Sequence, residues 1–527
     1  MMKQRTTYLL FFFLAIGTTL FAQPKNKLLK KRLRQAKKQL SYENYQLALP
    51  VFQDLWKLDS NNTEINFGLA KCLYVVRLNK QESFKYFKKS LSDYPKAYYY
   101  LGILYRYRLK FEASKQCFLN YKKTLTNQMG DEYDETMRQL SKTQMASESY
   151  KAPQEVIVRN LGENINSPYP DYAPFITPDE QSLYFTSRRP NLEHPERDPY
   201  GFPFEDIYVS NKRKGKWEQA ENIETPVNSS IHDACLGFSK DGQIMYIYRT
   251  EPDMISGDIY ISKFENTQWS IPRKYTKALN YPYSTEASLT ITQDEQTIYF
   301  SSDRAGGYGG KDLYRITRLP NGQWSLPLNL GAWINTPYDE DAPYVALDGR
   351  TLYFSSKGHE GLGDYDIYVT HMDSNGIWQQ PKNLGYPINT VFNDIFFIQS
   401  YDGKTNYFSS DRPEGLGSMD NYEIQFPDFK RDYVLLQGRV VRKDNSFIVN
   451  LSAVITVIDK ETNKLQGIYR TNKRTGKYVL ALLPRHYYKI IVELNGYYTF
   501  VANIDLRKSN EELKQFKYIM MTEKTDK

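Results

Sequence analysis

The sequence predicts a multidomain α + β protein with an N-terminal α-helical repeat, a central five-bladed β-propeller and a C-terminal β-sandwich. Apolar residues at helical spacing fill the first 150 residues, whereas short alternating stretches fill the rest of the 527-residue chain. In the middle, a unit of about 54 residues recurs five times. The predicted boundaries are 1–22, 24–150, 152–426 and 433–522.

The first segment, 1–22, is predicted to be a cleaved secretory signal. Lys3 and Arg5 precede an apolar run from Tyr8 to Ile16, and small residues lead to Ala22. The run is too short for a good membrane span, so we expect an exported protein; a retained amphipathic anchor is the alternative. No cysteine follows the signal, so the usual bacterial lipid attachment is not expected.

Charge is unevenly distributed along this chain of formal net charge +8. Residues 24–150 carry 24 Lys and Arg against 12 Asp and Glu, and residues 427–527 carry 19 against 11. The middle, 151–426, has a balance of −14. An acidic body between two basic segments bears on partners and solubility rather than on fold.

The helical segment resembles tetratricopeptide repeats, with Ser114 in place of the usual small alanine. The matching residues are Ala48, Phe52, Leu55, Phe87, Pro95, Tyr98, Leu101, Gly102, Tyr105 and Phe118. We expect about three helix pairs, with 129–149 as a capping helix. Stacked pairs form a concave groove for protein segments, and its candidate contacts are Tyr98, Leu101 and Tyr105. A helical spacer without a ligand is the alternative.

The start of the helical segment is strongly basic, with eight Lys and Arg among residues 25–38. Anionic lipid headgroups or lipopolysaccharide could attract this stretch, and a solvated helix face explains it equally well. Nucleic acid is a poor candidate for an exported protein. The candidate contacts with an anionic surface are Lys30, Lys31, Arg32, Arg34, Lys37 and Lys38.

The repeated unit predicts the propeller because several landmarks keep one register. Equivalent strands begin at Tyr184, Tyr246, Tyr299, Tyr353 and Tyr407, and the third strand region of four units ends at Trp217, Trp269, Trp324 and Trp378. The fifth unit stops near Phe426 without its last strand. We expect 155–162 to supply that strand and close the ring. Six blades are the alternative, if a neighbouring segment forms an unrecognised one.

A glycine-rich phrase, "SSDRAGGYGGKDLY" in unit three, lies between the second and third strands of three units. Glycine permits the turn, and the Asp that follows can accept backbone N–H bonds. A phosphate loop would open a helix, and a calcium loop needs more converging oxygens. We therefore interpret the phrase as a structural turn. It resembles the WD40-like repeats of TolB-type propellers.

A second periodic feature is a carboxylate just before the first strand of units two to five, at Asp233, Glu286, Asp341 and Asp394. Asp171 of unit one is taken as offset by one position. First strands line a propeller axis, so a ring of carboxylates at the channel mouth could bind a cation or a basic peptide. Alternatively, each carboxylate pairs with an arginine of the repeated phrase, such as Arg304 or Arg412, and ties adjacent blades together.

No enzyme is expected. Five-bladed glycosidases use carboxylates at an axial pocket, but a regularly repeated acid is better explained by architecture. The histidines form no metal-binding spacing, the three cysteines form neither a disulfide framework nor a zinc motif, and no cofactor is predicted. An insertion of about eight residues from Arg188 in unit one either decorates a binding face or is neutral surface.

The segment 433–522 resembles the carboxypeptidase-regulatory-like, transthyretin-type sandwich. The resemblance rests on Gly438-Arg439-Val440, Gly476-Lys477-Tyr478, Tyr488 and Gly496-Tyr497, and it implies seven strands without peptidase activity.

The order of the parts is similar to envelope proteins of Bacteroidota, in particular outer-membrane anchor proteins of type IX secretion and gliding. Those add an OmpA-like domain and a lipidated cysteine, which this sequence lacks. The resemblance implies a periplasmic scaffold at the outer membrane that binds envelope or secretion-machinery proteins and reaches peptidoglycan only indirectly. A glycan-binding or glycan-processing propeller at the cell surface is the rival hypothesis.

Overall fold

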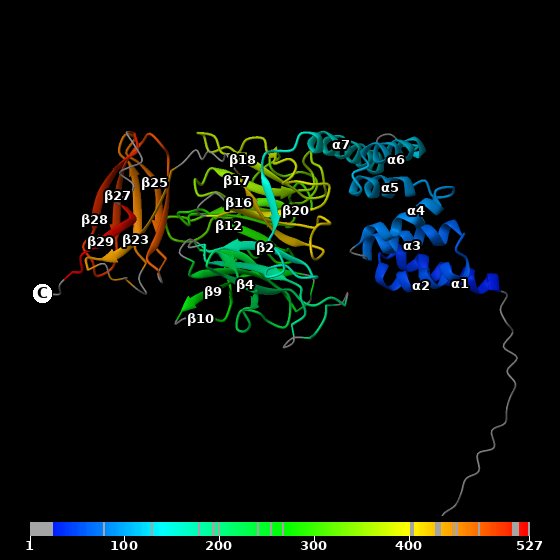
Figure 1. The fold of residues 1–527 in the computed structure, drawn as a ribbon, viewed down its shortest axis with the longest axis horizontal. Coiled ribbons are helices and arrows are strands. Elements are labelled where there is room, and N and C mark those ends of the chain that lie inside the picture. The colour runs from blue at the N-terminus through cyan, green and yellow to red at the C-terminus, as the bar shows by residue number, and fades with distance from the viewer. Residues whose placement is uncertain are drawn as a thin grey trace, which may run out of the picture. The chain divides into compact units, whose positions relative to one another are not determined.

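The computed structural model describes most of the chain from residue 25 to residue 524. The residues left out within this range are 77–78, 128–129, 178–179, 192–194, 199–200, 240–241, 253, 255, 266–267, 401–404, 427–433, 445, 447, 449–451, 473–474 and 508–515. The predicted signal, 1–22, lies outside the described residues. The chain divides into two compact units, Met1–Leu104 and Tyr105–Lys527. A helical N-terminal region is followed by a large β-rich region (Figure 1).

The helices are of moderate length, as the apolar spacing predicts. They are α1 (Lys25–Ser41), α2 (Tyr45–Leu58), α3 (Thr63–Val76), the short 3₁₀ helix η1 (Lys80–Ser83), α4 (Phe84–Ser90), α5 (Ala97–Tyr107), α6 (Phe111–Thr124) and α7 (Asp131–Lys151). The division between the two units falls within α5. No described helix is long and apolar enough to span a membrane.

The first unit is held together by one apolar core between α1, α2 and α3. In α2, residues 48, 49, 52 and 55 are buried, a spacing that places them on one helix face. Gly68 of α3 allows close approach, because a Cβ there would lie 2.3 Å from Cε1 of Phe52. The side chain of Asn62 accepts a hydrogen bond from Ile65 N (3.1 Å) and so caps the start of α3.

The middle of the chain forms five antiparallel sheets in a propeller-like ring. The first contains β2 (Asp171–Ile176), β3 (Ser182–Ser187), β4 (Asp206–Arg213), β5 (Lys216–Trp217) and β6 (Glu221–Asn222). The second contains β7 (Asp233–Phe238), β8 (Ile244–Thr250), β9 (Gly257–Glu265), β10 (Gln268–Trp269) and β11 (Arg273–Lys274).

The third and fourth sheets repeat this order with four strands each. The third contains β12 (Ser288–Ile291), β13 (Thr297–Ser302), β14 (Asp312–Thr317) and β15 (Leu328–Asn329). The fourth contains β16 (Glu340–Val345), β17 (Thr351–Ser356), β18 (Asp366–His371) and β19 (Lys382–Asn383).

The fifth sheet closes the ring by pairing the two ends of the repeat region. It contains β20 (Asp394–Gln399), β21 (Thr405–Ser410), β22 (Asp420–Gln425) and β1 (Ile157–Asn160). As predicted, β1 comes from before the first unit, and it pairs with β22 with Ile157 opposite Gln425. The innermost strands β2, β7, β12, β16 and β20 contact one another in cyclic order, and β2 contacts β20.

The C-terminal part consists of two sheets around one buried core. One sheet has the order β26-β23-β29 and the other β25-β24-β27-β28. The strands are β23 (Val434–Arg442), β24 (Val454–Asp459), β25 (Lys464–Arg470), β26 (Lys477–Leu482), β27 (Tyr487–Glu493), β28 (Phe500–Asp505) and β29 (Tyr518–Met521). Alternate residues of β24 and β27 are buried, which matches the period-2 pattern of the sequence.

Candidate functional site

The repeated carboxylates lie at the start of the innermost strands and are fully buried. We call them the ring acids: Asp171, Asp233, Glu286, Glu340 and Asp394. Each stands thirteen residues before the tyrosine that marks the next strand. The assignment of Asp341 to this set was wrong by one residue, because Glu340 holds the position, and Asp171 is in register rather than offset. Strict counting from the tyrosines identifies all five.

Four ring acids are paired with an arginine of the same sheet. The ion pairs are Arg189–Asp171 (2.7 Å), Arg249–Asp233 (2.6 Å), Arg304–Glu286 (3.1 Å) and Arg412–Asp394 (2.7 Å). The sequence correctly indicated Arg304 and Arg412 but missed the other two. In unit two the arginine stands earlier, on strand β8 itself.

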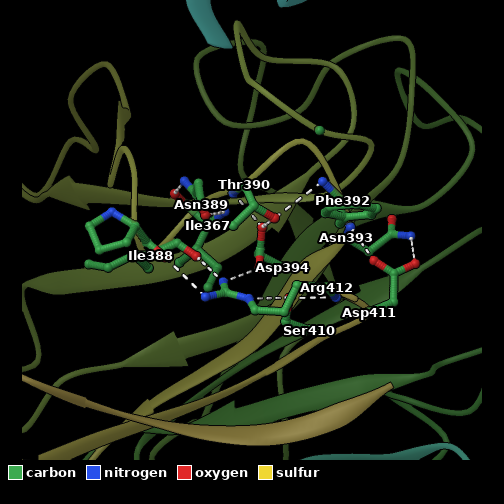
Figure 2. Close-up of polar contacts among 12 residues, drawn as sticks. Ile367, Ile388, Asn389, Thr390, Phe392, Asn393, Asp394, Ser410, Asp411 and Arg412 are labelled. Carbon is green, nitrogen blue, oxygen red and sulfur yellow. Dashed lines mark hydrogen bonds and ion pairs between the residues drawn. The ribbon is translucent and has the colours of Figure 1, made fainter. Parts of the chain in front are cut away.

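Each arginine also joins its sheet to the segment that arrives from the preceding one. Arg412 donates from Nη2 to the carbonyl oxygen of Ile388 (2.9 Å) and from Nε to Oγ of Ser410 (2.9 Å), as Figure 2 shows. Both Asp394 and Arg412 belong to the fifth sheet, so the ion pair itself does not cross between sheets. The expectation that each ion pair ties adjacent blades together was therefore wrong, because the arginine makes that connection through a backbone carbonyl instead.

A serine or threonine four residues before the ring acid donates hydrogen bonds to most of these carboxylates. Thr390 donates to Oδ2 of Asp394 from its backbone N (2.6 Å) and from Oγ1 (2.8 Å). Asn389, directly before Thr390, exchanges two hydrogen bonds with the backbone of Ile367 in the fourth sheet, at 2.8 and 2.7 Å (Figure 2). A buried charge therefore has a full set of donors, and the same segment anchors two neighbouring sheets.

The fourth sheet departs from this pattern because it has no arginine at the matching position. Gly358 stands two residues after Ser356, where the third and fifth sheets have arginine. A Cβ on Gly358 would lie 1.8 Å from Oγ1 of Thr336. His359 contacts the equivalent carbonyl instead, with Nε2 2.9 Å from the oxygen of Ile334.

Glu340 is consequently a buried carboxyl group that forms no ion pair with a described side chain. It accepts hydrogen bonds from Thr336 N (2.7 Å), Thr336 Oγ1 (2.7 Å) and Ser356 Oγ (2.6 Å). Burial raises the pKa of Glu340 to about 7, although these donors oppose the shift. Burial also raises the pKa values of Asp171, Asp233 and Glu286, against the effect of their partners.

Asp341, which directly follows the ring acid Glu340, has a different role. Its Oδ2 lies 2.8 Å from Nζ of Lys311 in the third sheet, and its Oδ1 accepts from Oγ of Ser301 (2.7 Å). The Lys311 ammonium holds the pKa of Asp341 below its usual value despite burial of the carboxyl group. This ion pair does cross between sheets.

Two small cavities lie along the axis of the ring, and one of them, of about 50 Å³, has the polar residues Thr290 and Gln399 in its lining. The other cavity, of about 40 Å³, is lined by residues of all five innermost strands, among them Tyr172, Leu236, Leu289 and Phe397. That volume holds only a few water molecules. The ring acids are not among its lining residues, so the described structure does not place them as a charged ring open to the channel.

An irregular polar cluster lies at the insertion of the first sheet. Nδ1 of His232 is 3.2 Å from the backbone N of Glu205, which donates to it, and 3.2 Å from Oε2 of Glu205. Arg188 and Asp198 form an ion pair at 2.5 Å nearby in sequence. The sequence marks the insertion as a departure from the repeat, but it does not mark Glu205 or His232 as partners. Neither residue recurs at the matching position of another unit.

The glycine-rich phrase is a turn held by its aspartate, as predicted. Asp312 accepts hydrogen bonds from Tyr308 N (2.6 Å) and Gly309 N (3.1 Å). Asp420 accepts from Leu416 N (2.5 Å) and Gly417 N (2.9 Å) in the same way.

The candidate groove residues of the helical part differ in exposure. Leu101 is buried in the core, whereas Tyr98 and Tyr105 are partly exposed. Leu101 therefore supports the helix packing rather than offering a contact surface. Whether the two tyrosines contact a protein segment stays a prediction.

The candidate basic residues lie on α1 and are mostly solvated. Lys30, Lys31, Arg34, Lys37 and Lys38 are exposed, while Leu33 and Ala36 on the other face are buried. Arg32 pairs with Asp54 of α2 (3.3 Å) and Lys37 pairs with Glu64 of α3. The helix thus presents a basic face that is also tied to its neighbours.

One group of side chains in the C-terminal part has metal-ligand types. The ligand atoms of Asp459, Glu461 and His486 lie within 4.8 Å of one another. Asp459 already accepts from the backbone N of Glu461 (2.8 Å) and contacts Nδ1 of His486 (2.5 Å), and Arg507 pairs with Glu461 (3.1 Å). These contacts account for the cluster without an ion.

Comparison with known proteins finds similarity only to solved structures. No protein-family model matches the chain, and no protein with a curated description matches it. The type III secretion translocator chaperone SycD of Yersinia enterocolitica is 13% identical, with a TM-score of 0.22, over 24% of this chain and 92% of that one.

Two hydrolase structures resemble a larger part of the chain. An α-L-arabinofuranosidase from Lactobacillus brevis is 13% identical, with a TM-score of 0.34, over 53% of this chain and 93% of that one. A glycosyl hydrolase from Bacteroides ovatus is 10% identical, with a TM-score of 0.35, over 50% and 86%. Identities and TM-scores this low carry no argument about activity or partners.

Proposed function

We propose that the protein is a non-enzymatic scaffold in the periplasm, peripherally associated with the outer membrane, that binds envelope or secretion-machinery proteins. In this proposal the ring of sheets is a five-bladed TolB-type propeller, and the C-terminal part is a transthyretin-like sandwich. The helical part holds one protein partner and the propeller another.

The observation that carries the proposal is the pairing of the ring acids. A glycosidase needs two carboxyl groups that flank a sugar bond in an accessible pocket. Here Asp171, Asp233, Glu286 and Asp394 are buried and paired with arginines of their own sheets. The repeated acids therefore serve the architecture, which favours a scaffold.

The channel supports the same reading. One cavity of about 40 Å³ is lined by residues such as Leu236, Leu289 and Phe396, and a neighbouring cavity of about 50 Å³ includes Thr290 and Gln399. A site for a sugar ring requires several times either volume.

A second candidate function, glycan binding or processing at the cell surface, has one observation in its favour. The Glu205–His232 cluster is irregular within the repeat and hence of the kind that chemistry uses. Its side chains are mostly buried, with exposed fractions of 18% for Glu205 and 12% for His232. We therefore rank this function second.

Affinity purification tests the proposal. The tagged mature protein is isolated from crosslinked, gently solubilised envelopes, beside a Tyr98→Ala variant and a matched Tyr42→Ala control at a residue that is 61% exposed. We expect stoichiometric envelope or secretion proteins, reduced by Tyr98→Ala and kept by Tyr42→Ala. A protein that purifies alone but is retained by envelope polysaccharide would overturn the scaffold and favour the glycan function.

A further inference from the structure

Helix α7 lies against the glycine-rich loop of the fourth sheet. Nζ of Lys142 donates to the carbonyl oxygens of Gly363 (2.6 Å) and Lys357 (3.1 Å). Lys142 is only 2% exposed, and burial lowers the pKa of its ammonium group. Backbone carbonyls thus serve as the acceptors of a buried lysine, which needs such partners.

An apolar contact accompanies this lysine one turn further along the helix. Ala146 (0% exposed) packs with Leu362 (1%) and Val391 (0%). Beyond it, the rings of Tyr150 and Tyr386 stack with centroids 3.9 Å apart. The helix therefore docks through lysine, alanine and tyrosine at i, i+4 and i+8, one face of an α-helix.

The loop that receives α7 is present in other sheets with the same local structure. In the fourth sheet, Asp366 accepts from Leu362 N (2.6 Å) and Gly363 N (3.3 Å). In the fifth, Asp420 accepts from Leu416 N (2.5 Å) and Gly417 N (2.9 Å). Leu416 is thus the counterpart of Leu362.

The neighbouring segment keeps the same backbone approach and one aromatic position, while Pro168 and Glu163 stand where the fourth sheet has Val391 and Tyr386. A Cβ on Gly363 would lie 1.9 Å from the carbonyl oxygen of Phe392, and a Cβ on Gly417 would lie 2.4 Å from that of Tyr169. Both loops therefore approach the next segment closely, and Tyr169 is the counterpart of Phe392. The ring of Phe392 stacks on that of Tyr107 in α5, with centroids 5.1 Å apart.

The two loops differ in what covers them. Leu362 is 1% exposed beneath α7, whereas Leu416 is 51% and Tyr169 38% exposed. Each loop also carries a glutamate two residues before its leucine, Glu360 in the fourth sheet and Glu414 in the fifth. The exposed loop thus presents a leucine and an aromatic side chain at the positions that the helical part covers in the fourth sheet.

We propose that the loop of the fifth sheet, with Leu416, Gly417 and Tyr169, is the docking site for a helix of a partner protein. The partner helix presents a lysine and a small residue one turn later, as α7 does with Lys142 and Ala146. The inference rests on the proposed scaffold function and names one of its surfaces. The lysine donates to the carbonyls of the glycine-rich loop, and the small residue covers Leu416.

The test uses α7 itself as the probe. A fluorescent peptide of residues 131–151, stapled between positions 137 and 141 on the exposed face so that it is helical, is titrated into the full-length mature protein. We expect saturable binding by anisotropy that weakens at least tenfold with Leu416→Asp in the protein or Lys142→Met in the peptide. Leu326→Asp, at a leucine that is 87% exposed elsewhere in the ring, leaves binding unchanged.

Two further outcomes make the result decisive. The added peptide could instead bind to the fourth sheet by displacing the protein's own α7, and its binding would then depend on Leu362. We therefore expect Leu362→Asp in the protein to leave the peptide bound, and a loss of binding would contradict the proposal. No saturable binding, or equal binding to Leu416→Asp and wild type, overturns the docking site. If partners still co-purify from envelopes in that case, the scaffold function survives and only this surface is rejected.

Discussion

The fourth and fifth sheets place a buried carboxyl group at the same point and stabilise it in different ways. In the fifth, Asp394 has an arginine at 2.7 Å and two donors from Thr390. In the fourth, Glu340 has the equivalent donors from Thr336 and a serine hydroxyl, and His359 takes the arginine's carbonyl contact. One is a paired charge and the other a carboxyl group with a pKa of about 7.

The difference shows how a repeat architecture tolerates the loss of a cation. Removing one partner of a buried ion pair normally leaves an uncompensated charge. Here the carboxyl group can take up a proton near neutral pH, while His359 keeps the arriving segment attached through Ile334. Hydrogen bonding and protonation together replace the ion pair.

The largest expected effect is that of Arg412→Met. The substitution leaves Asp394 buried without its cation and removes the bond to the Ile388 carbonyl. We expect the ring to lose about 3–5 kcal/mol of unfolding free energy, measured by denaturant titration with tryptophan fluorescence. Arg213→Met, at an arginine whose side chain is 78% exposed, is the control and should cost less than about 1 kcal/mol. Equal losses would refute the special role of the buried pair.

A pH-dependent effect is expected for Glu340→Gln. Because the pKa of Glu340 in the folded protein, about 7, exceeds its ordinary value, the folded state binds the proton more tightly than the unfolded state. The protonated Glu340 therefore contributes fully to the free energy of unfolding in acid. This contribution, about 3 kcal/mol in all, is lost as pH rises toward 7.

Glutamine mimics the protonated group, since its oxygen can accept from Thr336 N and its NH₂ can donate to the two hydroxyls. Glu340→Gln should thus stabilise the ring at pH 8 and have little effect at pH 4, as read from denaturation midpoints. Asp394→Asn should instead destabilise it at pH 8. The comparison fails if both substitutions change stability in the same direction at pH 8.

The smallest of the three effects is expected for His359→Ala. The substitution removes the hydrogen bond to Ile334 and the ring contacts with Phe354 and Tyr368, whose centroids are 5.8 and 5.2 Å away. We expect a loss of about 2 kcal/mol at pH 8.

The loss should shrink toward pH 5. Burial lowers the pKa of His359, so the wild-type protein loses this contribution as pH falls through the ordinary value for histidine. His371→Ala, at an exposed histidine, serves as the control and should change the denaturation midpoint by less than half as much. A cost for His359→Ala that is independent of pH would contradict this account.

Much of the fold follows from local patterns that survive in any context. The tyrosine landmarks, the glycine-rich turns with Asp312 and Asp420, and the supply of β1 from before the first unit were all predictable. Arg304 and Arg412 were also identified, because they stand in a repeated phrase. Asp341 was misassigned because two adjacent acids, Glu340 and Asp341, compete for one position and point to opposite faces of a strand.

The contacts of α7 could not be predicted from local sequence patterns. Lys142 donates to Gly363, more than two hundred residues away, and nothing in the helical pattern marks it as buried rather than solvated. The exposure of Leu416 was equally hidden, since Leu416 and Leu362 stand in nearly the same local sequence.

By itself, the sequence determined which residues form helices, strands and turns, and which positions recur in each unit. Those properties depend on spacing and on the backbone preferences of neighbouring residues. The tertiary structure alone decided that Arg249 of strand β8 supplies the ion pair in the second sheet and which of the repeated loops is covered by a helix. These differences depend on packing between distant segments, where one arginine on a strand or a single lysine on α7 selects one arrangement over another.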